Sequence, residues 1–424
     1  MSDPGRAAAG GRVVVTGAGL VGAWGLGLEP LAAALAAGEP LAEPVGRGTA
    51  ASAPPRPGRG IEVAARVPPG LALEPWLSRR EGRRMSPPSR FAVAAGRMAL
   101  AEAGLPVRPA PGPPAVPDPA LGVVLATAYG ASSFTQGMLD QAIDEGPDAM
   151  SPYLFMESVA NAPAGQVAIH CRAGGPNETL CQREAGPPSA VGRGAALVAA
   201  GRARRVLAGA VEEITPLLLS LLDRFGSLSA RPRPFDRRRD GFLVAEGSTL
   251  LLLEPEDDAL ARGAAPLAAV RAWGGAFDPT APRNDWGRGS AAVAAAIARG
   301  LGRAGLAPGD VDAVVSGASG ARRGDRFEAE TLRALFGPQG PPPVLAPKGV
   351  TGEYGGAYLA AALLVLASRP VGPVGGSSEP DPALGITPHG GGALLGASRV
   401  LVTGCAAGGS VAWVILESPG AVHR

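Results

Sequence analysis

Cysteine and histidine, which carry much of the covalent and proton-transfer chemistry in proteins, are scarce in this sequence. Its 424 residues contain three of each: Cys171, Cys181, Cys405, His170, His389 and His423. A thiol nucleophile needs an activating neighbour, and no histidine is suitably placed to activate Cys181, the main candidate. The cysteines lack metal-ligand spacing, so we expect neither a metal site nor a cofactor. We interpret the three histidines as structural or solvated.

Lysine is rarer still. Lys348 is the single lysine in a chain that otherwise uses arginine for positive charge. A lysine ammonium is a compact charge with three rotatable donors, whereas a guanidinium is planar. The retention of this one lysine therefore suggests a specific role, with chance retention as the alternative interpretation.

A glycine pattern near the N-terminus could bind a pyrophosphate. Gly17, Gly19 and Gly22 fit G-x-G-x-x-G and follow a β-branched run at residues 12–16. A dinucleotide site also needs an acidic residue at the end of a second strand, about 20 residues further on. Glu39 instead stands in a turn-like segment with no strand before it. We interpret the glycines as a tight structural turn rather than a cofactor site.

The composition indicates a soluble protein with a large core. The chain is 46% hydrophobic, and its formal net charge is +2 from 39 basic and 37 acidic side chains. It lacks the basic, aromatic-rich face typical of nucleic-acid binding. The longest strongly apolar run, at residues 357–367, is shorter than the roughly 18 residues that a membrane span needs. The N-terminus shows no signal-peptide pattern, so we expect a cytoplasmic protein without nucleic-acid or membrane partners.

Strand and helix patterns alternate along the chain, which favours an α/β layer architecture. In the first half we predict strands at residues 12–16, 122–126, 205–207 and 248–254, helices at 28–37, 90–103 and 190–200, and loops at 43–60 and 106–119. In the second half we predict strands at residues 267–273, 311–315 and 411–417 and helices at 291–304 and 327–336.

The two halves end alike. The first closes on the apolar strand STLLLLE and the second on VAWVILE. Two α/β halves of similar size are consistent with an internal duplication. We therefore predict an N-terminal half at residues 1–255 and a C-terminal half at residues 256–424.

Three segments resemble the ketosynthase family. Residues 13–25 (VVVTGAGLVGAWG) look like its opening strand and turn, residues 234–247 (PFDRRRDGFLVAEG) like its PFDxxRDGFVxGEG segment, and residues 347–357 (PKGVTGEYGGA) like its lysine-containing GHxxGA segment. The resemblance extends from about residue 12 to 417. It implies a thiolase-like fold, in which two similar α/β halves pack as a five-layered α-β-α-β-α sandwich that works as a dimer.

The catalytic positions of that family are not retained. Ketosynthases use a cysteine thiolate to carry the acyl chain and two histidines near the thioester carbonyl. Counting from the flanking motifs places Glu184 at the cysteine position, Gly317 at the first histidine position and Glu353 at the second. A carboxylate cannot replace the thiolate. Residues 404–410 (GCAAGGS) also replace the family's GFGGTN-like gate.

A ketosynthase-like chain without a nucleophile resembles the chain-length factors of type II polyketide synthases. Those subunits commonly show an E-Q-A-G-G-like stretch at the lost nucleophile, which residues 183–186 (REAG) resemble, and PKxxTGRxYSGA-like residues where PKGVTGEYGGA stands here. The resemblance implies a non-catalytic subunit that pairs with a catalytic ketosynthase. An acyl carrier protein carrying the polyketide chain would be the second partner.

Lys348 falls where the family has its active-site lysine, so the resemblance places it in a vestigial pocket with Glu184 and Glu353. Two carboxylates brought close together would raise one pKa. We therefore expect Lys348 to neutralise one of them.

The resemblance also implies that bulky side chains of the subunit limit chain growth in an acyl tunnel at the subunit interface. Four such side chains are tunnel candidates: Phe134, Met138, Phe155 and Met156. Ordinary core packing is the alternative for each.

Two other functions stay open at this point. One is a free-standing enzyme, either a malonyl-carrier decarboxylase or an unusual acyltransferase that uses Glu184 or Cys181. Related decarboxylases generally keep the histidines, which this chain lacks. The other is a structural pseudoenzyme that stabilises its partner without shaping a tunnel.

Overall fold

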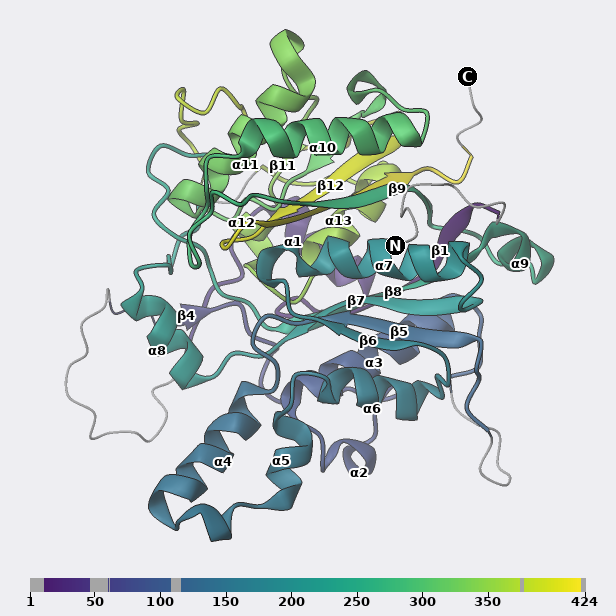
Figure 1. Ribbon diagram of the computed structural model, residues 1–424, viewed down its shortest axis with the longest axis vertical. Coiled ribbons are helices and arrows are strands. Elements are labelled where there is room, and N and C mark those ends of the chain that lie inside the picture. The colour runs from purple at the N-terminus through teal and green to yellow at the C-terminus, as the bar shows by residue number, and fades with distance from the viewer. Residues whose placement is uncertain (1–10, 46–59, 61, 108–115, 374–376, 421–424) are drawn as a thin grey trace.

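Five layers of secondary structure make up the protein in a computed structural model that describes residues 11–45, 60, 62–107, 116–373 and 377–420. From top to bottom in Figure 1 these are helices α10 (Ser290–Arg303) and α11 (Arg322–Phe336), a set of strands, the central α7 (Gly186–Ala199) and α13 (Ala357–Leu366), a second set of strands, and α3 (Pro87–Glu102) with α6 (Ala162–Cys171). The α-β-α-β-α fold expected from the sequence is confirmed.

The strands of the two halves form one continuous hydrogen-bonded sheet. The first half contributes β1 (Val13–Gly22), β2 (Gly25–Leu26), β5 (Leu121–Ala126), β6 (Asn177–Leu180), β7 (Arg205–Glu212) and β8 (Gly247–Pro255). The second contributes β9 (Ala268–Phe277), β10 (Ala313–Val315), β11 (Val344–Leu345), β12 (Arg399–Cys405) and β13 (Ser410–Glu417). Their order is β11-β10-β12-β13-β9-β1-β8-β7-β5-β6, with β2 paired to β1. Strand β1 joins the halves because it pairs with both β8 and β9.

The remaining elements are short or lie at the periphery. They are α1 (Leu28–Ala37), β3 (Glu43–Pro44), β4 (Val63–Ala64), α2 (Arg79–Gly82), α4 (Ser132–Asp144), η1 (Pro147–Ala149), α5 (Pro152–Ser158), η2 (Arg183–Ala185), α8 (Pro216–Arg224), α9 (Glu256–Ala261), η3 (Pro308–Asp310), η4 (Gly337–Gln339) and α12 (Lys348–Thr351). Of the loops predicted at residues 43–60 and 106–119, residues 46–59 and 108–115 fall outside the described residues, and the first loop begins with the short strand β3.

Continuous apolar runs form the elements that are covered on every side. Strand β8 is buried from Gly247 to Glu254, and helix α13 is buried from Ala357 to Val365. An element that is apolar on all faces is stable only when neighbours cover all of them. Helix α13 corresponds to the longest apolar run of the sequence, and no described helix is long and apolar enough to cross a membrane.

The predicted turn at Gly17, Gly19 and Gly22 is wrong. These glycines lie inside β1, and the turn comes after them, before β2. A Cβ atom on Gly17 would lie 2.0 Å from the carbonyl oxygen of Ala99, and one on Gly19 would lie 1.7 Å from that of Ala95. The glycines therefore let β1 pack directly on the backbone of α3 and form no cradle for a phosphate.

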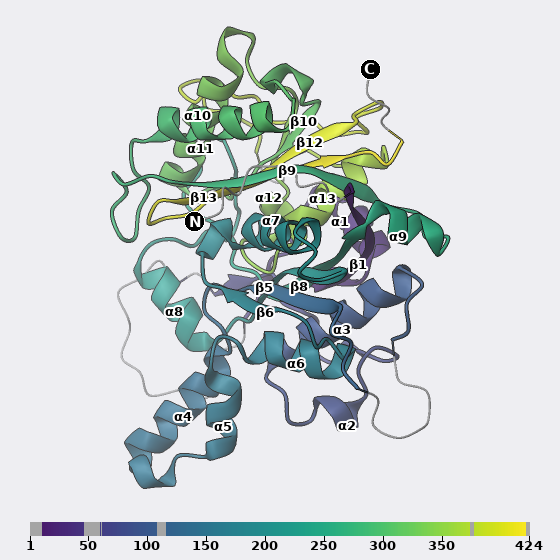
Figure 2. The ribbon, with the colours of Figure 1, turned by 45° about the vertical axis from the view of Figure 1, so that its right-hand side comes forward.

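Helices α4 and α5 form a hairpin that projects from the layered body in both views (Figures 1 and 2). No residue of α4 is fully buried. Several large apolar side chains of the hairpin and of the following segment through α6 are exposed: Leu139, Ile143, Phe155, Met156, Val159 and Ile169. The hairpin thus presents an apolar surface that the described residues do not cover.

Candidate functional site

Glu184 lies in η2, immediately before α7. Arg183 adopts a left-handed backbone conformation, with φ of 47°, and its guanidinium donates a hydrogen bond of 3.2 Å to the side chain of Asn284 near the surface. The Glu184 side chain is instead buried. The local backbone therefore directs one charged side chain outward and the next into the protein.

Lys348 and Glu353 form a buried ion pair. Lys348 begins α12 and Glu353 follows its end, and their side chains are only 1% and 2% exposed. The Lys348 ammonium donates to Glu353 Oε1 at 2.5 Å and lies 4.5 Å from the centre of the Tyr358 ring. The main chain of Glu353 is fixed by hydrogen bonds to Leu243 and Ala245. The only lysine of the chain thus pairs with a carboxylate that the backbone holds in place.

Glu184 accepts a hydrogen bond from a tyrosine rather than from the lysine. The Tyr354 hydroxyl donates to Glu184 Oε1 at 3.2 Å, and the hydroxyls of Tyr354 and Tyr129 are 3.0 Å apart. Glu184 Oε2 has no hydrogen-bond partner within the described part of the chain. Burial and the nearby Glu353 carboxylate raise the pKa of Glu184 to about 7, against the opposing effect of Lys348. Lys348 therefore neutralises Glu353, and Glu184 tends to hold a proton.

The raised pKa of Glu184 predicts a pH-dependent contribution to stability. Between pH 4.5, its ordinary pKa, and about 7, the unfolded chain loses the proton while the folded chain keeps it. The free energy of unfolding therefore falls as the pH rises through this window, by ~1.4 kcal/mol per unit from this one group. We expect Glu184→Gln to remove that contribution, so its stability should decline less between pH 5 and pH 7 in urea titrations. Identical slopes in the variant and the wild type would contradict the prediction.

Gly317, at the first histidine position, lies beside a buried carboxylate that the sequence analysis missed. Its backbone N–H donates to Glu328 Oε1 at 2.9 Å, and Ser316 and Thr403 donate their hydroxyls to the same oxygen. Burial raises the pKa of Glu328. A Cβ atom on Gly317 would lie 2.9 Å from the Thr403 carbonyl oxygen. An imidazole could not enter this position unless the backbone moved.

A hydrogen-bonded cluster of side chains, termed the pocket below, joins Lys348, Glu353 and Glu184 to Tyr354 and Tyr129, the two tyrosines being residues that sequence reasoning did not identify. Tyr354 is buried with φ of 81°, a conformation that costs a non-glycine residue of the order of 1–2 kcal/mol. It packs edge-on against the rings of Tyr129 and Phe242, at 5.3 and 6.0 Å between ring centres. Strain at a residue that is held by several contacts is common at present or former functional sites.

The pocket is linked to the start of α4 through Tyr129. The Glu212 carboxylate, at the end of β7, accepts hydrogen bonds from the backbone N–H groups of Ala128 and Tyr129 and from the Thr127 hydroxyl. Burial raises the pKa of Glu212 to about 8. These bonds fix residues 127–129, and Tyr129 then reaches Tyr354. Glu184 is thereby connected by hydrogen bonds to the segment that leads into the projecting hairpin.

The tunnel candidates lie on that hairpin and not in the pocket. Phe134 and Met138 are half-buried on α4, whereas Phe155 and Met156 on α5 are 59% and 64% exposed. In the isolated chain, Phe155 and Met156 therefore do not pack in the core. Phe134 packs against Tyr153, with their ring centres 6.1 Å apart, across the two helices.

Among the described residues, no cysteine forms a hydrogen bond or ion pair with a histidine. All three cysteines are unpaired, with Cys171 and Cys405 buried and Cys181 exposed. His170 is half-buried at the end of α6, where burial and Arg97 lower its pKa. His423 lies outside the described residues. No cluster of three or more potential metal ligands occurs among the residues that the structure describes.

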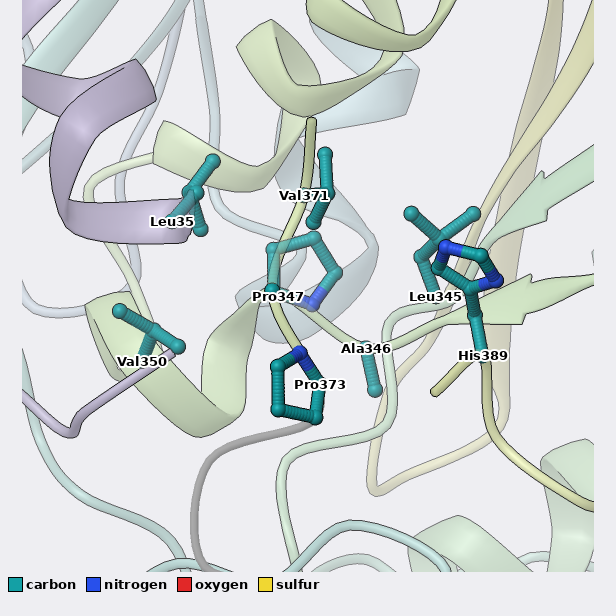
Figure 3. Close-up of a pocket in the computed structure, with 9 residues that line it drawn as sticks. Leu35, Leu345, Ala346, Pro347, Val350, Val371, Pro373 and His389 are labelled. Atoms are coloured by element: carbon teal, nitrogen blue, oxygen red, sulfur yellow. The ribbon is translucent and has the colours of Figure 1, made fainter. Parts of the chain in front are cut away.

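His389 borders a small apolar hollow that Pro347 and Val350 also line. Figure 3 shows His389 beside Leu345, across from Leu35 and Val350. Its ring Nε2 lies 3.2 Å from the Gly392 carbonyl oxygen. The hollow measures only about 10 Å³, room for about one water molecule. It is too small to be a substrate pocket.

Comparison with known proteins gives the family of this chain. Residues 11–259 match the beta-ketoacyl synthase N-terminal domain, and residues 268–369 match the beta-ketoacyl synthase C-terminal domain. The chain belongs to the beta-ketoacyl synthase family. The ketosynthase resemblance inferred from its motifs is confirmed.

Relatives of this beta-ketoacyl synthase homologue include subunits of polyketide synthases. The chain is 33% identical over 389 residues to the tetracenomycin polyketide synthase ketoacyl synthase beta subunit of Streptomyces glaucescens, covering 88% of this chain and 90% of that protein. It is 33% identical over 387 residues to the granaticin polyketide putative beta-ketoacyl synthase 2 of Streptomyces violaceoruber, covering 86% and 85%. The solved ishigamide ketosynthase/chain length factor matches with a TM-score of 0.85 and 27% identity, covering 97% of this chain and 100% of that chain.

Proposed function

We propose that the protein is the non-catalytic chain-length-factor subunit of a type II polyketide ketosynthase, acting in the cytoplasm. The observation that carries the proposal is the buried Glu184 at the position of the family's nucleophile, bound by Tyr354. A glutamate in this setting cannot form the thioester that chain extension requires. The similarity to the tetracenomycin beta subunit supports the same assignment.

Pairing with a catalytic ketosynthase would cover the apolar surface of the hairpin. Phe155, Met156 and Ile169 are each more than half exposed in the isolated chain. Exposed apolar clusters of this kind mark protein–protein contacts. A solved relative is described as a ketosynthase/chain length factor, and another structure holds a type II acyl-carrier protein in complex with its ketosynthase. We infer that the partners here are a cysteine-bearing ketosynthase and an acyl carrier protein.

Co-expression with a candidate ketosynthase subunit tests this proposal. The tag is placed on this chain alone, and the native mass of the purified material is measured. We expect a one-to-one heterodimer that extends a carrier-bound chain only when both subunits are present. A stable homodimer that does not bind the ketosynthase would overturn the proposal. Variants of Glu184 and Cys181 would then be assayed for decarboxylase or acyltransfer activity.

The proposed role predicts that side chains of α4 limit product length. Phe134 is half-buried and contacts Tyr153 of the hairpin, so truncation would open space between α4 and α5. We expect the heterodimer containing Phe134→Ala to make a longer polyketide as its main product, measured by mass spectrometry. Leu260→Ala is the control, because Leu260 is 57% exposed on the distant α9. Unchanged product length in the Phe134 variant would exclude this residue from the tunnel.

A free-standing decarboxylase or acyltransferase has no observation in its favour. The Glu184 carboxyl is buried, and burial favours its protonated, non-nucleophilic form. Cys181 is exposed, and the rings of His170 and His389 lie beside Glu81 and the Gly392 carbonyl group, respectively. The chain-length-factor assignment is therefore the one that we retain.

A further inference from the structure

Five arginines lie within nine residues, on the segment that connects α8 to β8: Arg231, Arg233, Arg237, Arg238 and Arg239. They divide into two groups. Arg237 and Arg238 pair with Glu379, and Arg239 pairs with Asp381. Arg231 and Arg233 form no ion pair with any carboxylate in the described ranges.

A buried aspartate holds the arginine-rich segment in place. The fully buried Asp236 carboxylate accepts backbone hydrogen bonds from Arg238 at 2.7 Å, Ser378 at 3.0 Å and Glu379 at 2.8 Å. It thereby joins the arginine-rich segment to residues 378–379. Side chains mounted on such a backbone need little rearrangement to bind a ligand.

A hollow of about 460 Å³ opens between these segments and the end of α1. Its lining consists of Arg231, Arg233, Arg238, Ser378, Glu39 and Pro40. This volume lies within the usual range of small-molecule sites, roughly 300–1,000 Å³. Three arginines and one glutamate are among the residues that line it. Arg238 is paired with two carboxylates, Glu379 at 3.3 Å and Asp236 at 3.5 Å, so the uncompensated charge of the lining is that of Arg231 and Arg233.

From this arrangement we propose that the hollow lined by Arg231, Arg233 and Arg238 binds the diphosphate group of a small molecule. Guanidinium groups offer paired N–H donors that match phosphate oxygens. The Ser378 hydroxyl lies beside Arg238, from whose guanidinium it accepts a hydrogen bond. The negative charge of a bound diphosphate would also reduce the repulsion between neighbouring guanidinium groups. The Glu39 carboxylate also lines the hollow, and its negative charge disfavours a long polyanion such as nucleic acid. The site is separate from the Glu184 pocket and does not depend on the proposed function.

Isothermal titration calorimetry with inorganic pyrophosphate, and separately with ADP, tests this site on the full chain or its purified complex. We expect saturable binding that Arg231→Gln/Arg233→Gln weakens ~10-fold or more, since hydrogen bonds to charged groups are lost. The control is Arg299→Gln/Arg303→Gln, which removes the same charge from exposed positions on α10 and should bind like the wild type. Tighter binding of ADP than of pyrophosphate would identify an organic diphosphate as the ligand, and the reverse an inorganic one.

Three results would overturn the proposal. They are no binding of either probe to the wild type at millimolar concentration, undiminished binding to the Arg231/Arg233 variant, and equal weakening in the α10 control. Circular dichroism and a melting curve check that each variant is folded. If the double variant does not fold, Arg231→Gln alone is used, because Arg231 is exposed and supports no described ion pair.

Discussion

Replacement of Lys348 by alanine is expected to lower the free energy of unfolding by about 3–5 kcal/mol. The lysine ammonium is the direct partner of Glu353, whose side chain is only 2% exposed. Removing one member of a buried pair leaves the other charge without compensation, and here the buried Glu184 carboxyl lies close enough to raise the cost. The measurement is urea denaturation of the purified chain or its heterodimer, followed by circular dichroism.

A double variant separates loss of the charge pair from loss of packing. In Lys348→Ala/Glu353→Gln the unpaired carboxylate is also removed, so most of the lost stability should return. A single Lys348→Ala variant that folds and pairs with undiminished stability would show that the lysine has no electrostatic role. If the double variant is as unstable as the single one, the lysine acts through packing against the Tyr358 ring rather than through its charge.

The second large effect is expected from Gly19→Ala, at about 3 kcal/mol or more of lost stability. The added Cβ atom would lie 1.7 Å from the carbonyl oxygen of Ala95, and the nearest atoms belong to the backbone of α3, which cannot turn aside as a side chain can. Strand β1 and helix α3 would have to separate. Thermal and urea unfolding of the variant measure this loss.

The matched control is Gly302→Ala, because on α10 a Cβ atom at Gly302 would meet no atom within 4 Å other than the adjacent backbone of its own helix. Alanine has a higher helix propensity than glycine, so this change should be neutral or stabilising by up to ~1 kcal/mol. A Gly19→Ala protein as stable as the wild type would mean that β1 and α3 are not packed as closely as described.

Elements with a clear hydrophobic period were predictable from the sequence. The helix predicted at residues 28–37 is α1 (Leu28–Ala37). The strand predicted at 205–207 is only the start of β7 (Arg205–Glu212), because the following Ala-Gly-Ala residues have low β propensity and become strand through their place in the sheet. The hairpin of α4 and α5 was not predicted as helices. Helix α4 contains Ser132, Ser133, Thr135 and Gly137, whose low helix propensity weakens the local helix signal.

The glycine pattern and the pocket show why the sequence around a residue is not enough to predict its role in the fold. Gly17 and Gly19 have the spacing of a turn, but their small size serves contact with α3, which lies far along the chain. Glu328 and Tyr354 reach the pocket from different elements, and no local pattern indicates that they meet. The sequence contained one indication that Glu328 is buried, because it lies between the apolar residues Phe327 and Ala329, which are buried on α11. A charged residue within a buried stretch generally has a specific partner.

The burial of Lys348 makes the chain selective toward amine-reactive reagents. Its ammonium is the only side-chain amine in the sequence, and its side chain is 1% exposed and bound to Glu353. Acylating dyes and crosslinkers should therefore attach to the folded protein at the N-terminal amine alone. Lys348 becomes available to them only when the pocket opens. Attachment of a second dye to a molecule would therefore show that its pocket had opened, without any engineered label.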